Sequence, residues 1–333
     1  MLRRQLLLLV GMVVFLLLPH AAAQETNSLF PIPQNEKFGF IDHSGNVVAA
    51  PQFDDVGDFA QGLAPVKLGA KWGYVDRGGL LVIKAQFDMA EPFWENMPLA
   101  AVKVGNRWGY IDKGGNMAIM PQFDDAMAFY DGLALVKIGR QTEFIDLNGQ
   151  AAITEKSADK FDFVTPFAEG LAAARQGGGF GYIDHMGKFV IPPQFQKAWY
   201  FTDGLAAVKV KGKWGYINRE GHTVVPPQFD DAFPFREGLA AIKVGDKWGA
   251  IDGKGTVVVA PQFVDLFFQF FNGLAAVKVG SKWGFIDRTG TMAIAPQFDD
   301  ARPFWSGLAR VKIGARWGYI DEAGKFVWGP ADW

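Results

Sequence analysis

"GLAAVKVGSKWGFIDRTGTMAIAPQF", residues 273–298, carries the pattern that decides the fold. Strand-forming residues occupy 274–279 and again 282–286, and a two-residue turn that begins with glycine separates them. This combination predicts a β-hairpin with a type II′ turn. A third strand is expected over 292–295 and should end at Pro296, because proline lacks the backbone N–H that a sheet ladder uses. The stretch therefore predicts a three-stranded antiparallel meander followed by a connecting loop.

The centre of this stretch is repeated along the chain, mostly at a spacing of 34 residues. The nine copies are FGFID (38–42), WGYVD (72–76), WGYID (108–112), TEFID (142–146), FGYID (180–184), WGYIN (214–218), WGAID (248–252), WGFID (283–287) and WGYID (317–321). Paired-helix repeats can have a similar period, but the glycines and the usual proline in each unit leave no room for two helices. The expectation is an all-β tandem array of ~34-residue, three-stranded meander repeats.

The two ends of the array bear on whether it closes. It begins and ends in the same hairpin, so that nine hairpins are joined by only eight linkers. A closed propeller usually permutes its first blade, whereas an open solenoid needs capped ends. We therefore expect an open superhelical, solenoid-like array, with a closed β-propeller as the alternative.

The aspartate that ends almost every copy is followed three residues later by glycine. Aspartate at the first position of a type I turn bonds its own backbone, and glycine at the fourth position adopts a left-handed conformation. We therefore interpret these aspartates as turn residues rather than catalytic acids or metal ligands. They are Asp42, Asp76, Asp112, Asp146, Asp184, Asp252, Asp287 and Asp321, with Asn218 in the ninth place.

The hairpin register also assigns a role to the recurring tryptophan. If Val279 pairs with Lys282, Lys278 lies opposite Trp283, and the lysine stem can cover the indole while its charge stays in water. The glycine after the tryptophan has no side chain, and it therefore leaves space for a neighbouring group to pack against the strand. We expect structural roles for Trp72, Trp108, Trp214, Trp248, Trp283 and Trp317. The lysine position is filled by Lys67, Lys103, Lys137, Lys209, Lys243, Lys278 and Lys312, with Arg175 in the remaining copy.

The stretch "GLAAVKVGSKWGFIDRTG…APQFDDARPF" resembles the WG-repeat (KWG) family of bacterial proteins, and the resemblance extends over essentially the whole chain after its first 36 residues. It implies an all-β repeat array and a binding or scaffold role, commonly in exported or surface proteins. It supplies no catalytic residues.

The amino terminus has the layout of a secretory signal peptide. Arg3 and Arg4 precede a short apolar run, and the small residues 21–23 favour cleavage before Gln24. We thus expect residues 1–23 to be the signal peptide, 24–36 a linker, 37–326 the repeat array and 327–333 a tail. The protein is expected to be periplasmic or secreted, with no stable membrane span after cleavage. An uncleaved anchor is the alternative, although the run is short for a bilayer.

Composition narrows the possible functions. The 333 residues carry a net charge of −2, so nothing favours nucleic acid as a partner. The chain has no cysteine, which excludes thiol catalysis and thiolate metal sites. It contains no HExxH, GxSxG or phosphate-loop motif. We expect no cofactor and no metal, and a non-enzymatic scaffold that binds an envelope protein, a peptide or a glycan. The alternative is a carbohydrate-active enzyme on a propeller-like array, with carboxylates at one mouth.

Function is expected where the repeats differ, because the shared positions build the core. The residue after the linker phenylalanine reads Ala60, Trp94, Tyr130, Ala168, Thr202, Arg236, Phe271 and Trp305. Since alanine is accepted there, we predict that the large aromatics form an exposed binding ledge. The candidate binding residues are Trp94, Tyr130, Trp199, Tyr200, Phe271 and Trp305.

Two other departures are interpreted structurally. The acidic pairs Asp54-Asp55, Asp124-Asp125, Asp230-Asp231 and Asp299-Asp300 could ligate Ca²⁺, but neighbouring residues in a strand point apart, so turn and linker roles are favoured. In the fourth unit, Thr142-Glu143 replaces Trp-Gly and the polar segment 154–160 replaces the proline linker, as in a decayed repeat.

Overall fold

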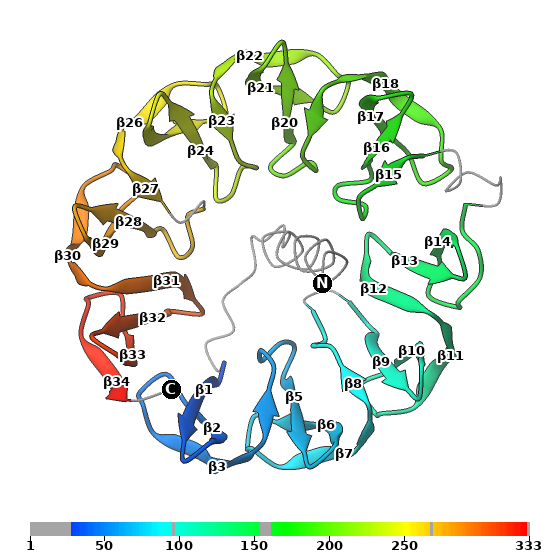
Figure 1. Ribbon diagram of the computed structural model, residues 1–333, viewed down its shortest axis with the longest axis vertical. Helices are drawn as coiled ribbons and strands as arrows, with labels where there is room; N and C mark the ends of the chain where they lie inside the picture. Colours follow the sequence, from blue (N-terminus) through cyan, green and yellow to red (C-terminus); the bar gives the residue numbers. More distant parts are fainter. Residues whose placement is uncertain (1–27, 95–96, 154–160, 267–268, 332–333) are drawn as a thin grey trace.

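The chain folds into a closed ring of blades, a β-propeller (Figure 1). The computed structural model describes residues 28–94, 97–153, 161–266 and 269–331. Within these residues, nine antiparallel sheets follow one another around the ring, and we number them as blades 1 to 9 in chain order. The all-β repeat prediction is confirmed, but the preference for an open superhelical array is wrong.

The strands of the nine blades have the following bounds. Blades 1 to 3 contain β1 (Phe30–Gln34), β2 (Lys37–Ile41) and β3 (Val47–Phe53); β4 (Asp55–Val56), β5 (Leu63–Leu68), β6 (Lys71–Asp76) and β7 (Leu81–Phe87); and β8 (Met89–Ala90), β9 (Ala100–Val104), β10 (Arg107–Ile111) and β11 (Met117–Phe123). Blades 4 to 6 contain β12 (Asp125–Tyr130), β13 (Leu133–Ile138) and β14 (Gln141–Ile145); β15 (Phe163–Val164), β16 (Ala172–Gln176), β17 (Gly179–Ile183) and β18 (Phe189–Phe195); and β19 (Lys197–Ala198), β20 (Leu205–Val210), β21 (Lys213–Asn218) and β22 (Thr223–Phe229). Blades 7 to 9 contain β23 (Asp231–Ala232), β24 (Leu239–Val244), β25 (Lys247–Asp252) and β26 (Val257–Phe263); β27 (Asp265–Leu266), β28 (Ala275–Val279), β29 (Lys282–Ile286) and β30 (Met292–Phe298); and β31 (Asp300–Trp305), β32 (Leu308–Ile313), β33 (Arg316–Ile320) and β34 (Phe326–Ala331).

The predicted hairpin register is confirmed in blade 8. Val279 pairs with Lys282, and Lys278 pairs with Trp283. Gly280 has φ +61°, which suits the first central position of a type II′ turn. In most blades, however, the linker adds a short innermost strand that pairs with the next hairpin, so the typical blade has four strands instead of three.

The outermost strand is longer than predicted. In blade 8 it continues through Pro296 to Phe298, because a proline is tolerated on an edge strand whose N–H side faces away from the sheet. This strand is bulged: Trp283 pairs with Phe298, but Phe285 pairs with Ile294. The bulge brings backbone onto the glycine after the tryptophan. A Cβ built on Gly284 would lie 2.6 Å from the Ile294 carbonyl oxygen.

The hydrophobic core lies between neighbouring blades. The cluster at one joint combines Trp283 and Ile294 of blade 8 with Phe304 and Ile320 of blade 9. A tyrosine hydroxyl also bonds across several joints; Tyr216 Oη, for example, donates to the Phe233 carbonyl oxygen at 2.8 Å. The same bond joins Tyr74 to Glu91, Tyr110 to Met127 and Tyr182 to Trp199. Burial raises the pKa of these tyrosines, so their hydroxyls remain donors.

The amino-terminal segment closes the ring. Residues 30–34, expected to be linker, form β1, which pairs with β2 just as the second strand does in other blades. Tyr319 Oη of blade 9 donates to the Pro31 carbonyl oxygen of β1 at 3.0 Å, so the same tyrosine position bonds across the closing joint, although its acceptor lies on another strand. The expected tail also contributes, since β34 extends to Ala331. Closure needs no exchange of strands between the chain ends, which is why the unpermuted repeat pattern was misleading.

The decayed fourth unit still forms a blade. Blade 4 has three strands among the described residues, and only an isolated bridge from Ile145 to Ala151 stands where other blades begin an outer strand. The polar segment 154–160 and the signal peptide over 1–23 lie outside the described residues.

Candidate functional site

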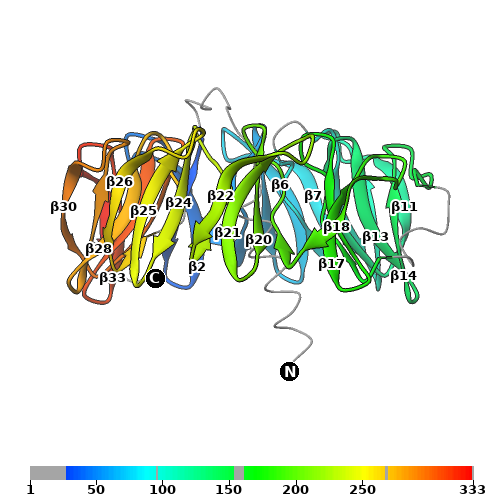
Figure 2. The ribbon, with the colours of Figure 1, turned by 90° about the horizontal axis from the view of Figure 1, so that it is seen from above.

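The antiparallel strands place two kinds of turn on one face of the ring, which we call the turn face (Figure 2). The first kind is the Asp-x-x-Gly turn, and its predicted structural role is confirmed. In blade 2, Gly79 N–H donates to the Asp76 carbonyl oxygen at 3.0 Å. Asp76 Oδ1 accepts hydrogen bonds from the backbone N–H of Gly78 and Leu80. Asp112 and Asp287 form equivalent turns.

The predicted structural role of the acidic pairs is also supported, on the opposite face. Asp230 Oδ1 accepts from Lys213 Nζ of blade 6 at 2.5 Å, and its Oδ2 accepts from Gly245 N–H of blade 7 at 2.8 Å. The same bridge is built by Asp54, Asp88, Asp124 and Asp299. The second aspartate of each pair bonds the next backbone N–H, as Asp231 does with Ala232. These carboxylates join blades or cap the backbone.

Lysine lies over tryptophan as predicted. Lys209 Nζ is 5.7 Å from the ring centroid of Trp214, and Lys243 Nζ is 5.5 Å from that of Trp248. The pairs at Trp108, Trp283 and Trp317 are similar. Trp108, Trp214, Trp248 and Trp283 are buried, whereas Trp72 and Trp317 are half-buried. Each of these rings packs in its blade.

The aromatic ledge is not an exposed surface. Trp94, Tyr130, Tyr200 and Phe271 are buried, and Trp199 and Trp305 are half-buried. The rings of Phe271 and Trp305 lie 6.3 Å apart across the joint between blades 8 and 9, and Trp199 packs with Phe233. The predicted exposure is therefore wrong for the four buried residues. At several joints the aromatic side chains fill space between blades where alanine leaves room for other groups. A role for this position in binding stays a prediction.

The second kind of turn on the turn face joins the innermost strand to the next one, and we call it the inner turn. Its two central residues have positive φ, as at Gln61 (+51°) and Gly62 (+84°), which is typical of a type I′ turn. Among the described residues, the first of them reads Gln61, Asp131, Glu169, Asp203, Glu237, Asn272 and Ser306. The sequence pattern contains this polar row, but it is found only when the turns are aligned.

The inner turns bond to one another around the ring. Asp131 accepts from Gly170 N–H at 2.6 Å, Glu169 from Gly204 at 3.0 Å and Asp203 from Gly238 at 2.9 Å. Glu237 continues the series with two backbone N–H groups of blade 8. At the closing joint, the Ser28 and Ser306 hydroxyls are 3.0 Å apart. From Asp131 to Glu237 the side chain of one inner turn thus reaches the inner turn of the next blade, whereas Asn272 donates to Glu322 in the Asp-x-x-Gly turn of blade 9.

Cations extend from the Asp-x-x-Gly turns over these inner turns. Arg288 of blade 8 donates to the Glu237 carbonyl oxygen of blade 7. Arg219 of blade 6 lies over Gly170 of blade 5, where a Cβ would be 3.2 Å from its guanidinium. Its charge acts on the neighbouring Glu169, whose pKa is nevertheless raised by burial. In both places the cation lies over the inner turn of the preceding blade, where the first central residue is a glutamate.

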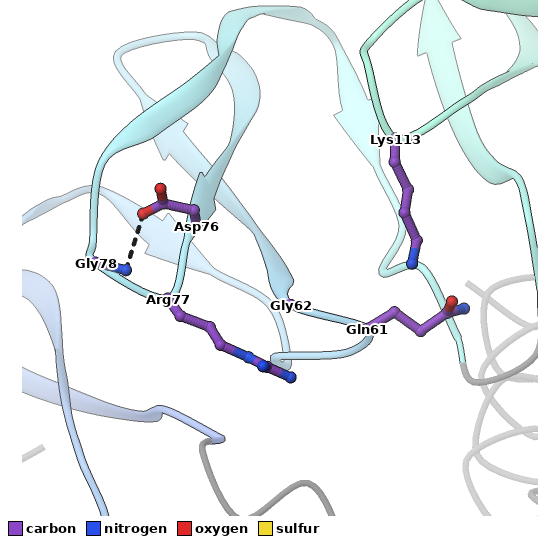
Figure 3. A pocket seen from close by; sticks show the side chains of 6 residues that line it. All are labelled: Gln61, Gly62, Asp76, Arg77, Gly78 and Lys113. Carbon is purple, nitrogen blue, oxygen red and sulfur yellow. Dashed lines mark hydrogen bonds between the residues drawn. The ribbon is translucent and has the colours of Figure 1, made fainter.

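The hollow between blades 2 and 3 departs from that arrangement. It has a volume of about 480 Å³ and is lined by Gln61, Gly62, Asp76, Arg77, Gly78 and Lys113 (Figure 3). Lys113 is the blade 3 equivalent of Arg219 and Arg288, but the inner turn that it faces carries Gln61 instead of glutamate. The Gln61 amide donates to backbone carbonyl oxygens of blade 3, including that of Trp94. Arg77 and Lys113 thus line one hollow, and the inner turn beneath Lys113 carries an uncharged residue.

A different group of charges lies on the innermost segments of blades 2 and 3. Asp58 and Glu91 are half-buried, and burial raises the pKa of both carboxyl groups. The charges of Asp125 and Asp58 raise the pKa of Glu91 further, while Arg310 of blade 9 acts in the opposite direction on Asp58. Paired carboxyl groups with raised pKa values can serve acid–base chemistry.

Metal and membrane features are absent from the part of the chain that the structure describes. It contains no cluster of three or more histidine or acidic side chains placed to hold a metal ion. None of its helices is long and apolar enough to cross a membrane.

A family model described as "WG containing repeat" matches the sequence eight times. The matched residues are 38–72, 72–108, 108–140, 159–179, 180–214, 214–248, 248–283 and 283–317. No protein in the curated set matches this chain in sequence.

Solved structures resemble the chain in fold only. A eukaryotic initiation factor has a TM-score of 0.59 at 11% identity, over 90% of this chain and 94% of that one. Hsv2p of Kluyveromyces lactis has a TM-score of 0.41 at 9% identity, over 67% of this chain and 89% of its own. AztD from Citrobacter koseri has a TM-score of 0.39 at 12% identity, over 90% and 92%. The first of these likenesses supports the propeller architecture.

Proposed function

Because the chain belongs to the family of WG-containing repeat proteins, we propose that it is an exported, non-enzymatic scaffold in the cell envelope. Its partner would be a protein, a peptide or a glycan. The observation that carries this proposal is the hollow between blades 2 and 3, which is lined by Arg77, Lys113 and the uncharged Gln61, whereas Glu169 and Glu237 occupy the equivalent turns of blades 5 and 7. The repeated tryptophans, turn aspartates and linker aspartates are all engaged in structure, which leaves the departures from the repeat to bind.

The rigidity of the ring supports a binding role. Neighbouring blades are joined by buried side chains, by linker aspartates on one face and by inner turns on the other. A surface held in this way loses little conformational entropy when it binds, and such preorganisation favours affinity. Export is supported by the layout of residues 1–23, which is that of a secretory signal peptide.

The test is a binding screen with the chain from Gln24 onward. Immobilised protein would be titrated with purified cell-wall glycans and envelope proteins, and saturable binding to one class is expected. The matched control is the same chain after heat denaturation. The proposal fails if no member of the screen binds saturably, or if the chain converts one of them to product.

A second function, a carbohydrate-active enzyme, is favoured by one observation. Asp58 and Glu91 are half-buried carboxyl groups on neighbouring blades, and burial raises the pKa of each, as is required of the general acid in glycoside hydrolysis. The release of reducing ends from a panel of polysaccharides would test this function. Activity lost in both Asp58→Asn and Glu91→Gln would support the enzyme, whereas the absence of any release would exclude it for that panel.

A further inference from the structure

We infer that the outer edge of blade 2, strand β7, binds an extended segment of a partner protein that carries an acidic residue among apolar ones. The segment would add a strand to the sheet of the blade, a known mode of peptide recognition. This inference rests on the proposed binding function, and it names the kind of partner and the surface that meets it. It follows from a comparison of β7 with the outermost strands of the other blades.

β7 is the last strand of its sheet, and it lies on the rim of the ring (Figure 1). The sheet of blade 2 has the order β4-β5-β6-β7, so one side of β7 has no partner strand among the described residues. Such an edge presents backbone N–H and C=O groups that can pair with another chain. Proteins usually protect their edges, and proline is one means of doing so, because it lacks the N–H that a ladder uses.

Every other outermost strand in blades 1 to 3 and 5 to 9 contains a proline near its end. These prolines are Pro51 in β3, Pro121 in β11, Pro193 in β18, Pro227 in β22, Pro261 in β26, Pro296 in β30 and Pro330 in β34. Most of these strands end in the sequence Pro-Gln-Phe, and in β7 Ala85 takes the place of the proline. The edge of blade 2 therefore keeps a backbone N–H that proline removes in the other blades.

A second departure lies at the start of the same strand. The residue after the Asp-x-x-Gly turn of blade 2 is Leu80, which is 68% exposed. The other eight copies have a polar residue at this position, namely Asn46, Asn116, Gln150, Lys188, His222, Thr256, Thr291 and Lys325. Leu81 and Val82 follow Leu80 and are also exposed. Three consecutive exposed apolar residues thus lead into the edge that lacks proline, and exposed apolar surface of this kind marks interaction sites.

Lys84 determines which kind of segment fits this edge. Its side chain is exposed, and no hydrogen bond or ion pair of Lys84 is found within the described residues. The equivalent residue is uncharged in the strands that end in Pro-Gln-Phe: Ala50, Met120, Pro192, Pro226, Ala260 and Ala295. Opposite charges on neighbouring strands stabilise a sheet. A segment with an acidic residue opposite Lys84 would therefore pair better than a purely apolar one.

The same charge argues against a second copy of the chain as the occupant. Antiparallel pairing of β7 with itself would bring two Lys84 side chains into one short interface. The strand reads LVIKAQF and contains no acidic residue that could neutralise them. Like charges on paired strands destabilise the pairing. A different chain with its own acidic residue is thus the better occupant.

The experiment measures peptide binding to the full exported chain, from Gln24 onward, by fluorescence anisotropy. The probe is a labelled, end-blocked peptide of the length of β7, in which valine and threonine alternate and the central residue is aspartate. A comparison peptide has lysine at its centre. Each variant is checked by a thermal melt.

The variants are chosen from residues that the repeats already accept. Ala85→Pro, Leu80→Asn and Lys84→Ala each restore a residue found at the same position in other blades, so the fold should be kept. The matched pair is Val82→Thr in β7 and Val190→Thr in β18. These valines occupy equivalent positions and are 50% and 49% exposed, but only the second lies on an edge with proline.

We expect the aspartate peptide to bind the wild type, and to bind at least about tenfold more weakly to Ala85→Pro, because proline removes a ladder N–H and crowds the approaching strand. Leu80→Asn and Val82→Thr should weaken binding by a smaller factor, and Val190→Thr should bind like the wild type. The lysine peptide should bind the wild type more weakly than the aspartate peptide does. Lys84→Ala should remove that difference between the two peptides.

Other outcomes overturn the inference. It is wrong if the aspartate peptide does not bind, if Ala85→Pro melts and binds as the wild type does, or if Val190→Thr weakens binding as much as Val82→Thr. Sedimentation velocity tests the second copy, and a wild-type dimer that Ala85→Pro dissociates would overturn the choice of occupant.

Failure of this inference can be told apart from failure of the proposed function. If the screen for the proposed function finds a partner whose affinity is unchanged in Ala85→Pro, the scaffold function stands and this surface is wrong. If the probe binds as expected while the screen finds no partner, the edge of blade 2 stands and the proposed envelope function is wrong.

Discussion

The glycine after the tryptophan tests how tightly the blades are built, and Gly249→Ala in blade 7 isolates that effect. A Cβ on Gly249 would lie 2.4 Å from the Val259 carbonyl oxygen, 2.8 Å from Pro261 N and 3.0 Å from the Ala260 carbonyl carbon. All three atoms are backbone of the bulged strand β26, so no flexible side chain can move away. Overpacking of this kind costs about 1–3 kcal/mol. We expect a value near the upper end.

The same blade provides a control for the entropy of the unfolded chain. A Cβ on Gly253 would meet only Leu205 Cδ1, at 3.8 Å, which is an ordinary contact. Replacement of glycine by alanine at such a site stabilises by about 0.4–1 kcal/mol through the unfolded state. That gain applies to both variants and offsets part of the steric cost in Gly249→Ala. The free energy of unfolding should therefore fall by about 2 kcal/mol in Gly249→Ala and stay unchanged or rise slightly in Gly253→Ala.

Urea unfolding followed by tryptophan fluorescence measures both variants against the wild type. Gly249→Ala should lower the midpoint, and Gly253→Ala should leave it unchanged or raise it. Equal shifts in the two variants would refute the steric argument, because it depends entirely on the contact with β26.

Three further predictions concern separate parts of the chain. Trp214→Ala should lower the free energy of unfolding by about 3–5 kcal/mol, because the ring is buried between blades 6 and 7. Replacement of the half-buried Trp72 by alanine should lower it less, and thermal melts that rank the two variants in the opposite order would contradict this. The Lys213 ammonium and the Gly245 N–H lower the pKa of Asp230, so its contribution to stability is present above the unfolded pKa and is lost as the pH falls through the lower folded value. Asp230→Asn should therefore lose less stability than the wild type on acidification below about pH 4, and parallel pH profiles would rule this out. Finally, the exported protein should begin near Gln24, and intact mass spectrometry that finds Met1 would disprove cleavage.

Local structure could be predicted from the sequence because each repeat position has one dominant physical role. The pairing of Val279 with Lys282 and the turn at Asp287 follow from strand periodicity and turn chemistry alone. The continuation of β30 past Pro296 was missed because proline stops a central strand but is tolerated on an edge strand. The short innermost strands were missed because strands of two residues, such as β4, have no periodicity to detect.

The closure of the ring and the candidate site between blades 2 and 3 both depend on how neighbouring repeats pack against one another. Whether an array closes is set by the rotation between neighbouring blades, which arises from bulges and core packing that no single repeat encodes. The exposed ledge was wrong because tolerance of alanine was taken as evidence of exposure, whereas Phe271 and Trp305 fill the joint between two blades. The hollow could have been found one position further along the repeats, where Gln61 stands against an acidic residue in five other units, namely Glu95, Asp131, Glu169, Asp203 and Glu237.

At the closing joint, the surface of blade 1 (the head) and the surface of blade 9 (the tail) are complementary. Tyr319 meets Pro31, and Leu308 packs with Phe30 and Ile32, with no strand exchanged across the junction. A copy opened at this joint would offer the same tail to the head of any other copy, and such heterologous contacts continue as linear assemblies unless they close. The tethering of both ends to one ring keeps their effective concentration high, so self-closure prevails in dilute solution. Removal of a single blade would alter the angle at which the head meets the tail, and would shift the balance from a self-contained disc toward chains of molecules joined end to end.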